Sequence, residues 1–404
     1  MDKYLWIGGF YHPSKRDYYL KNGHMIMSSY KSQKNIFDGI EESCNVIFDS
    51  INSMRVNAFP SFKRIIIKKE KWTHNSIGND ISVPYLNIKY LSVLFRTIAL
   101  KKEAKKWAKR HKNDNVYVFC FGMTSPFMKA CISVSKIVKQ TTLVLINPDL
   151  PQFMEKSPSK IKRMLKRFDA KWINKNISKF HKEILYSKHM AQFLKLPNNS
   201  WIVMEGSICL DDYLDLKKIR SDDKIRVLYA GVVGKMYGVD KLVESLKYLN
   251  DDYELVVYGS GDYEAELKRI ASVNHRIVYK GYCGDRNELL QAQRNADILI
   301  SLINPEDDVS KYCFPSKIFE YMLSGNLVIS SKILGIPDEY FDYIFPLDSI
   351  DPSNIAKTIA NISLLSKEKK QEISEKEIDF VLKTKNNLVQ GRRIFNFVKN
   401  GEAL

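Results

Sequence analysis

Lys317 and Glu320 carry the strongest candidate chemistry in this chain, because they stand three residues apart where the sequence predicts the start of a helix. Pro315 suits the first position of that helix, which is expected to end just before Gly325. The amides of residues 316–318 would lack partners inside the helix, and the helix dipole adds positive charge there. Together with the Lys317 ammonium, they favour an anion. Glu320 would lie on the same helix face.

A carboxylate beside an anion site needs an explanation. A ligand that carries both a diphosphate and a sugar diol would satisfy both groups, because the carboxylate can accept hydrogen bonds from two hydroxyls. Alternatively, Glu320 only stabilises the helix N-terminus and Lys317 is solvated. The local residues leave both interpretations open.

The segment from Phe314 to Ser330 (FPSKIFEYMLSGNLVIS) resembles the nucleotide-sugar segment of family 4 glycosyltransferases of the GT-B fold. The resemblance implies an α/β protein with two Rossmann-like, doubly wound domains that face each other across a cleft. It implies that Glu320 holds the nucleotide ribose. It also assigns donor binding to a short run, Phe314, Pro315, Ser316 and Ile318. The family usually has a second Glu eight positions earlier, where this chain has Tyr312, so that donor-sugar contact is not implied.

A glycine-rich turn follows the strand predicted at residues 225–230. Gly231 and Gly234 would let the backbone approach a phosphate, and Lys235 could reach a diphosphate as a point charge. The turn resembles the one that opens the C-terminal domain of the same family, which usually carries an Arg and a Lys. Val232 stands at the Arg position and Tyr237 near the Lys position, so Lys235 is the expected substitute.

Further candidates follow other predicted strands. Gly259 begins a glycine turn, and the resemblance implies that Tyr282, or the backbone beside it, holds the base, unless Tyr282 only packs. Asp149 follows a buried strand, where polar residues line the ligand crevice of doubly wound sheets. It is therefore a candidate for the acceptor or the donor sugar, although Asp between prolines is also a common turn residue. Gly8 and Gly9 follow the first strand, and the resemblance implies that they lie on the acceptor side. A tight turn would explain them equally well.

At 404 residues the chain is too long for one ordinary core, and strands alternate with helices as in parallel sheets that are covered on both faces. We expect an N-terminal, acceptor-side domain at 1–206, a linker at 207–224 and a nucleotide-sugar domain at 225–375. The resemblance implies that a C-terminal helix, at 376–404, crosses back to the first domain.

Positive charge is concentrated in the first half. Residues 1–206 hold 36 Lys and Arg against 15 Asp and Glu, whereas residues 207–404 hold 27 against 31. An anionic partner, either nucleic acid or a membrane surface, would explain this asymmetry. A lysine-rich genome would explain it as well.

The most basic segment, residues 156–188, places Trp and Phe at helical spacing among eleven Lys and Arg. Such a helix suits the interface of an anionic bilayer, although its apolar face could equally belong to the core. No nucleic-acid motif is present, so a membrane is favoured over nucleic acid. The residues expected to face the membrane are Lys162, Arg163, Lys166, Arg167 and Trp172.

These features together predict a cytoplasmic glycosyltransferase that is peripherally bound to the inner face of the cell membrane. The six cysteines occur singly, no metal-ligand cluster is evident, and no signal peptide or membrane span is expected. The resemblance implies a retaining, metal-independent reaction without a cofactor, in which a UDP- or GDP-linked sugar is the donor. A lipid-linked saccharide of a capsule, exopolysaccharide or O-antigen would be the acceptor. Lys235, Lys317, Glu320 and Asp149 are the catalytic candidates. A GT-B nucleotide-sugar epimerase and a non-catalytic member of a polysaccharide complex remain the alternatives.

Overall fold

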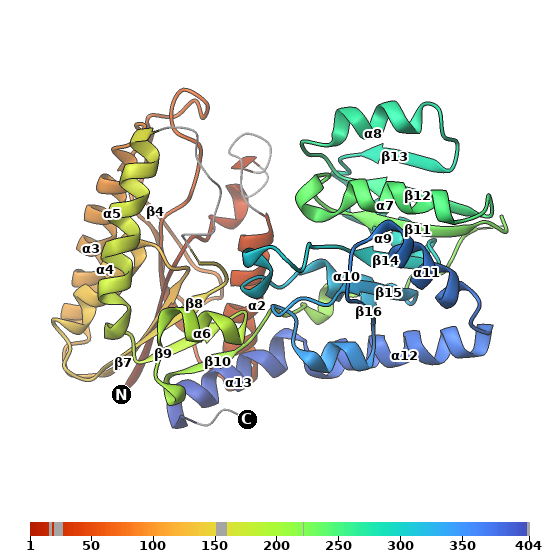
Figure 1. The fold of residues 1–404 in the computed structure, drawn as a ribbon. Coiled ribbons are helices and arrows are strands. Elements are labelled where there is room, and N and C mark those ends of the chain that lie inside the picture. The colour runs from red at the N-terminus through yellow and green to blue at the C-terminus, as the bar shows by residue number, and fades with distance from the viewer. Residues whose placement is uncertain (16–17, 20–26, 151–159, 221, 402–404) are drawn as a thin grey trace. The chain divides into compact units, whose positions relative to one another are not determined.

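The computed structural model describes residues 1–15, 18–19, 27–150, 160–220 and 222–401, which form two compact units (Figure 1). The first unit combines Met1–Ser207 with Asn387–Leu404, and the second contains Ile208–Asn386. Most of the expected linker thus belongs to the second unit. The reason is local, because Lys218 and Arg220 both form ion pairs with Asp297, at 2.6 and 2.9 Å.

The first unit is built on an eight-stranded sheet, in which all neighbouring strands are parallel except the edge pair β4 and β5. A separate antiparallel pair joins β3 (Ile66–Ile67) to β6 (Tyr85–Leu86). The order across the main sheet is β10 (Trp201–Val203), β9 (Lys182–Leu185), β8 (Thr141–Asn147), β7 (Asn115–Phe121), β1 (Asp2–Gly8), β2 (Phe48–Asn52), β5 (Asp80–Ser82) and β4 (Glu70–Trp72).

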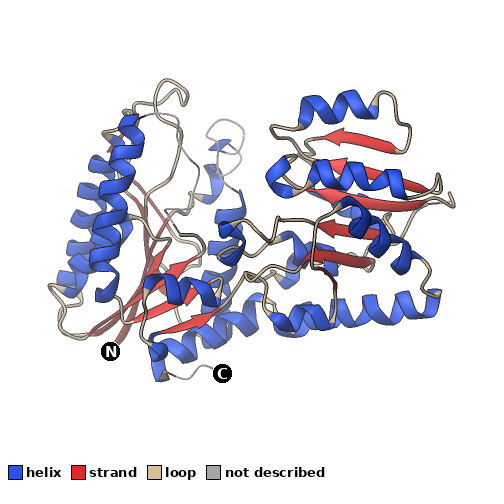
Figure 2. Ribbon diagram, viewed as in Figure 1, coloured by secondary structure: helices blue, strands red, loops and turns tan. Residues whose placement is uncertain are grey.

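Helices cover both faces of this sheet, as the sequence predicts (Figures 1 and 2). One face carries α3 (Ser92–Arg110), α4 (Ser125–Ser135) and α5 (Lys160–Asn176), and α6 (Lys188–Leu194) lies between β9 and β10 in the chain. The other face carries α2 (Met27–Cys44), which packs against α13 (Asn387–Asn400). The two helices approach closely at Gly39 and Gly391, where an added Cβ would lie within 2.2 Å of the opposite backbone.

The second unit contains a six-stranded, fully parallel sheet with the strand order of a Rossmann fold. Numbered within the unit, the order is 3-2-1-4-5-6, and the direction of winding reverses between β11 and β14. The strands across the sheet are β13 (Ile277–Gly281), β12 (Tyr253–Tyr258), β11 (Ile225–Ala230), β14 (Ile298–Ser301), β15 (Leu327–Ser331) and β16 (Phe345–Leu347).

Two hydrophobic cores lie on either side of this sheet. One packs α7 (Val239–Ser245), α8 (Glu264–Ala271) and α11 (Pro352–Ser363) against the strands, and the other packs α9 (Arg286–Arg294), α10 (Lys317–Met322) and α12 (Lys367–Thr384). The expected pair of Rossmann-like, doubly wound domains is therefore confirmed.

The C-terminal tail contains two helices rather than one. Phe380 and Val381, at the end of α12, are buried in the core of the second unit. Ile394 and Phe397 of α13 are buried in the first unit. The boundary between the units thus falls at Asn387, eleven residues later than the sequence analysis placed it, because the apolar residues of α12 are needed to cover β15.

Candidate functional site

The backbone of two glycine turns forms the carboxyl edge of the second sheet, meaning the edge at which its parallel strands end. After β11, the amide of Gly231 donates to Tyr258 O (3.0 Å), and the amide of Val233 donates to Ser260 O (3.0 Å). Gly259 has φ +128°, and a Cβ there would lie 1.8 Å from the carbonyl oxygen of Gly231. A side chain at this position would force the two turns apart, because the obstacle is backbone.

Two tyrosines that the sequence analysis missed hold these turns. The Tyr321 hydroxyl, on α10, accepts from the amide of Ala230 (2.9 Å) and donates to its carbonyl (3.1 Å). The Tyr229 hydroxyl donates to Val232 O (2.8 Å). Burial raises the pKa of both phenols, so both stay neutral donors. In the sequence, each tyrosine appears only as an aromatic residue inside an apolar segment. Such a segment does not show that the hydroxyl will bond the backbone of another element.

The loop after β14 leads to α10, which begins at Lys317 with Ser316 as its N-cap. Lys317 Nζ lies 2.6 Å from Oε2 of Glu320, and both side chains are partly exposed, so the structure joins the two residues that the sequence placed on one face. The expected set of open amides needs one correction. The Ile318 amide donates to Pro315 O (2.9 Å), because the chain tightens into a three-residue turn before the helix.

The neighbouring residues of this segment pack against the core or end local helices. Phe314 lies 5.1 Å, between ring centroids, from both Phe319 and Tyr340, so its ring belongs to the core. Gly325 has φ +72° at the end of α10, as its assignment to the helix C-terminus predicts. Tyr312, which replaces the family's Glu, ends the short 3-10 helix Asp308–Lys311.

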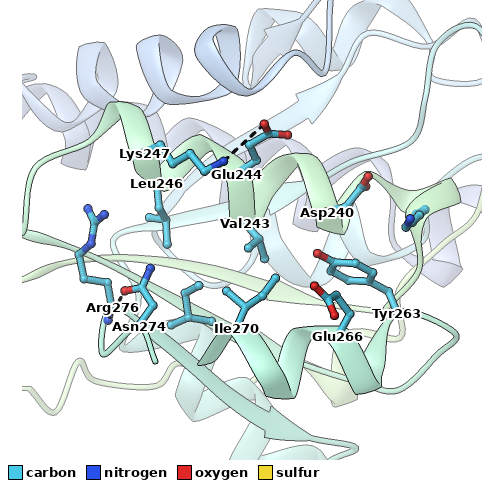
Figure 3. A pocket seen from close by; sticks show the side chains of 12 residues that line it. Asp240, Val243, Glu244, Leu246, Lys247, Tyr263, Glu266, Ile270, Asn274 and Arg276 are labelled. Atoms are coloured by element: carbon cyan, nitrogen blue, oxygen red, sulfur yellow. Dashed lines mark hydrogen bonds and ion pairs between the residues drawn. The ribbon is translucent and has the colours of Figure 1, made fainter. Parts of the chain in front are cut away.

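Lys235 follows β11, the strand next to β14, but it lies at the α8 side of the sheet. Its ammonium is exposed and lies 6.0 Å from the centroid of the Tyr263 ring. It also lines a cavity of about 540 Å³ between α7 and α8, where Asp240 and Glu266 stand near Tyr263 (Figure 3).

Three other sequence-predicted positions lie along the same edge. Val232 is exposed at the position where the family has Arg, and Gly234 is buried beside it. Tyr282 follows β13 at the end of the sheet and is 78% exposed. Its ring is therefore available to a ligand and does not pack into the core.

Side chains, rather than glycine turns, build the carboxyl edge of the first sheet. Gln33 Oε1 accepts from the Gly9 amide (3.0 Å) and from Trp6 Nε1 (3.1 Å). Asn52 Oδ1 accepts from the Phe10 amide (3.0 Å). Gly8 and Gly9 thus lie in an ordered turn. The sequence analysis did not identify Gln33 and Asn52 as the residues that hold this turn, because a single polar residue in a strand or helix does not reveal its hydrogen-bond partner.

Asp149 lies two residues past β8 and is exposed. Its surroundings raise the pKa of the carboxyl, chiefly through partial loss of hydration, and the positive charge of Arg55 opposes that rise. The structure thus places Asp149 at the carboxyl edge of the first sheet, near a guanidinium.

The basic helix expected to face a membrane is α5, and its apolar residues divide into two groups. Ile173 is buried, whereas Met164, Leu165 and Phe168 are exposed, with Phe168 at 65%. The charged residues Arg163, Lys166 and Arg167 are exposed beside them.

Trp172 does not fit this expectation. Its ring is partly buried, and Lys129 Nζ of α4 lies 4.6 Å from its centroid, because this turn of α5 packs on its neighbour. Lys162 lies in α5, but its side chain is outside the described part, as are residues 156–159. Across the described ranges, every helix is too short or too polar to traverse a bilayer.

Comparison with known proteins supports the GT-B fold. Residues 214–379 match the family described as glycosyl transferases group 1, and a search of curated proteins finds no match. HepE of Anabaena, solved in complex with UDP, is 14% identical, with a TM-score of 0.61 over 98% of this chain and 99% of that one. A glycosyltransferase of Rickettsia africae is 15% identical, with a TM-score of 0.64 over 99% and 98%. An Escherichia coli protein, titled trehalose-6-phosphate and bound with UDP-2-fluoro glucose, is 9% identical, with a TM-score of 0.64 over 98% and 99%.

Proposed function

We propose that this chain is a retaining, metal-independent glycosyltransferase that moves a sugar from a nucleotide diphosphate to a lipid-linked saccharide. The observation that carries the proposal is the edge of the second sheet, where closely packed glycine turns and the Lys317–Glu320 pair follow neighbouring strands. The complexes of HepE with UDP and UDP-glucose support a UDP-linked donor, and a GDP-linked donor is the alternative.

The protein's chemical task is to stabilise the departing nucleoside diphosphate. Negative charge grows on that group as the glycosidic bond breaks, so preorganised positive groups lower the barrier. Lys317 and Lys235 would supply that charge. Glu320 would accept the ribose hydroxyls, and it would release Lys317 from their 2.6 Å ion pair when the diphosphate arrives. Tyr282 would stack on the base.

A direct test is calorimetric titration of the full chain with UDP, GDP and their sugar conjugates, repeated with Glu320→Ala and Lys317→Ala. We expect one nucleotide to bind and both variants to weaken it by about ten-fold or more, as for loss of a hydrogen bond to a charged group. Lys376→Ala is the matched control, because this lysine forms a similar exposed ion pair, at 2.7 Å to Glu372, on α12. Unchanged nucleotide affinity in both site variants would refute the proposed site.

We further propose that α5 holds the enzyme on the anionic inner face of the cell membrane, during assembly of a surface polysaccharide. Exposed Phe168 beside Arg163, Lys166 and Arg167 supports this interaction, because apolar and cationic groups act together at a bilayer interface. Co-flotation with phosphatidylglycerol vesicles should fall strongly in the double variant Lys166→Glu/Arg167→Glu. Phosphatidylcholine vesicles should recruit little of either protein. Equal flotation of both proteins with anionic vesicles would contradict the assignment.

A further inference from the structure

Two guanidinium groups, those of Arg55 and Arg96, lie near each other beyond the carboxyl end of β2. Arg96, on α3, donates from Nε to Ser53 Oγ (2.7 Å) and from Nη2 to Ser53 O (3.3 Å). Arg55 follows Ser53 by two residues, and its side chain is exposed. In the part of the chain that the structure describes, neither guanidinium has a carboxylate within ion-pair distance.

Two buried tyrosines fix the segment that carries Arg55. The Tyr11 hydroxyl donates to Arg55 O and the Tyr85 hydroxyl to Met54 O, each at 2.9 Å. The Tyr85 ring also lies 5.7 Å from the guanidinium carbon of Arg96. The backbone that carries Arg55 is therefore held before any ligand binds, which lowers the entropic cost of binding.

This arrangement is electrostatically unfavourable without an anion. Loss of hydration lowers the pKa of Arg96 to about 10, and the charge of Arg55 adds to that effect. Although Arg55 is exposed, partial loss of hydration lowers its pKa as well, while Tyr11, Asp149 and Asp169 oppose that shift. Two like charges held beside each other repel until an anion joins them. The planar guanidinium matches the geometry of a phosphoryl group.

An exposed apolar side chain shares the α3 face that carries Arg96. Val93 precedes Arg96 by three residues, about one helical turn, and is 47% exposed, whereas Leu94 and Ile98 lie on the other side of the helix. Ile66 of β3 is also exposed, and β3 pairs with the strand that carries Tyr85. Apolar surface beside a pair of cations matches a ligand that is both anionic and lipidic.

We propose that Arg55 and Arg96 bind the phosphoryl group through which the acceptor saccharide is attached to its lipid. The proposal rests on the proposed glycosyltransferase function, which it extends to the acceptor's chemical class. Val93 would contact the first part of the lipid chain. A neutral saccharide would leave both cations without a counter-ion and would therefore bind poorly.

The test uses farnesyl diphosphate and inorganic pyrophosphate as probes of the full chain. All five tryptophans belong to the first unit, so quenching of their fluorescence reports binding there. We expect farnesyl diphosphate to bind more tightly than pyrophosphate, and Arg55→Ala to weaken it by about ten-fold or more. Arg64→Ala is the matched control, because Arg64 is another exposed guanidinium nearby, stacked on Tyr18 at 4.7 Å. It should change affinity less than two-fold.

Each outcome decides a different point. Wild-type affinity for farnesyl diphosphate in Arg55→Ala would overturn the proposal, and Arg55→Lys, which keeps the charge, guards against a folding artefact. Equal, Arg55-dependent affinity for both probes would overturn the lipid assignment and identify a soluble phosphate as the ligand. If farnesyl diphosphate binds in an Arg55-dependent manner but no nucleotide binds to the second unit, the proposed glycosyltransferase function is refuted and the Arg55 site is not.

Discussion

The two units share a doubly wound architecture, yet different groups form the carboxyl edges of their sheets. We call the edge of the second sheet the backbone edge and that of the first sheet the side-chain edge. In the second unit the edge is backbone, because Gly231 and Gly259 bring two turns into direct contact. In the first unit the edge consists of side chains, in which Gln33 and Asn52 hold the turn after β1. A site built from close backbone contacts requires glycine at particular positions, which can be recognised in the sequence. A site built from dispersed polar side chains leaves no such pattern.

The largest expected effect comes from adding a methyl group to the backbone edge. Gly259→Ala places Cβ 1.8 Å from the Gly231 carbonyl oxygen at a φ of +128°, so the turns must separate. We expect a loss of about 3 kcal/mol in the stability of the second unit, from overpacking and backbone strain, and loss of nucleotide binding. Circular dichroism during urea unfolding measures the first effect and calorimetry the second.

Tryptophan fluorescence supplies the internal control, since it follows the first unit alone. Its unfolding midpoint should not move in Gly259→Ala. Retention of both wild-type stability and nucleotide affinity would show that the close packing of the two turns is not required.

The side-chain edge should depend on pH, because its hydrogen bonds lead to a histidine. Asn52 Nδ2 donates to Ser50 Oγ (2.7 Å), Ser50 Oγ donates to Asp80, and Asp80 Oδ2 lies 2.7 Å from Nδ1 of His74. Burial lowers the pKa of His74, but hydrogen bonds with Asp80 and Glu41 outweigh it and raise the pKa to about 9. This stabilisation is complete below the unfolded pKa near 6.5 and is lost as pH rises through about 9.

We therefore expect the tryptophan-monitored unfolding free energy to fall by on the order of 2 kcal/mol between pH 6.5 and pH 9.5. In His74→Gln this dependence should be much weaker. If His74→Gln keeps the full wild-type pH profile, His74 is not the group responsible for the pH dependence of stability.

A smaller effect is expected where one hydroxyl serves the backbone edge. Tyr321→Phe leaves the amide and the carbonyl of Ala230 without their partner inside a buried core. Leaving buried polar groups unsatisfied costs about 1–3 kcal/mol, so circular dichroism should show a loss within that range. The matched change Tyr253→Phe removes a hydroxyl that bonds Ser363, a partly exposed residue, and should cost less. Equal losses would mean that the Ala230 bridge has no special role.

The same difference between the edges explains what the sequence predicted. Alternating apolar strands and helices were enough to predict both Rossmann-like units, and glycine turns drew attention to the edge of the second. The first unit was harder to predict because β2, an internal strand of its sheet, is polar. The apolar residues at 46–48 favour a strand, but α2 extends to Cys44 and β2 begins only at Phe48. Ser50 and Asn52 are buried there by hydrogen bonds rather than by apolar packing.

Single residues of the sites show the same limit. Lys317 and Glu320 could be paired from helical spacing alone, because they belong to one short element. Arg55 and Arg96 are 41 positions apart and meet only through the fold, so nothing in their sequence context distinguished them from other basic residues. Trp172 was misjudged because periodicity identifies an apolar face but not the neighbour that covers it.

The smallest structural effect is expected at Gly9, and it separates packing from function at the side-chain edge. A Cβ added there would have its nearest neighbour, Ser53 O, at 3.8 Å, which is an ordinary contact. Gly9→Ala should therefore change the tryptophan-monitored stability by less than about 0.5 kcal/mol, as for most substitutions away from a packed site. If the turn after β1 lies against the acceptor, the same methyl group should raise the acceptor KM and leave nucleotide affinity unchanged. Wild-type acceptor kinetics would mean that Gly9 serves the turn alone, and that only the second unit uses its glycines to admit a ligand.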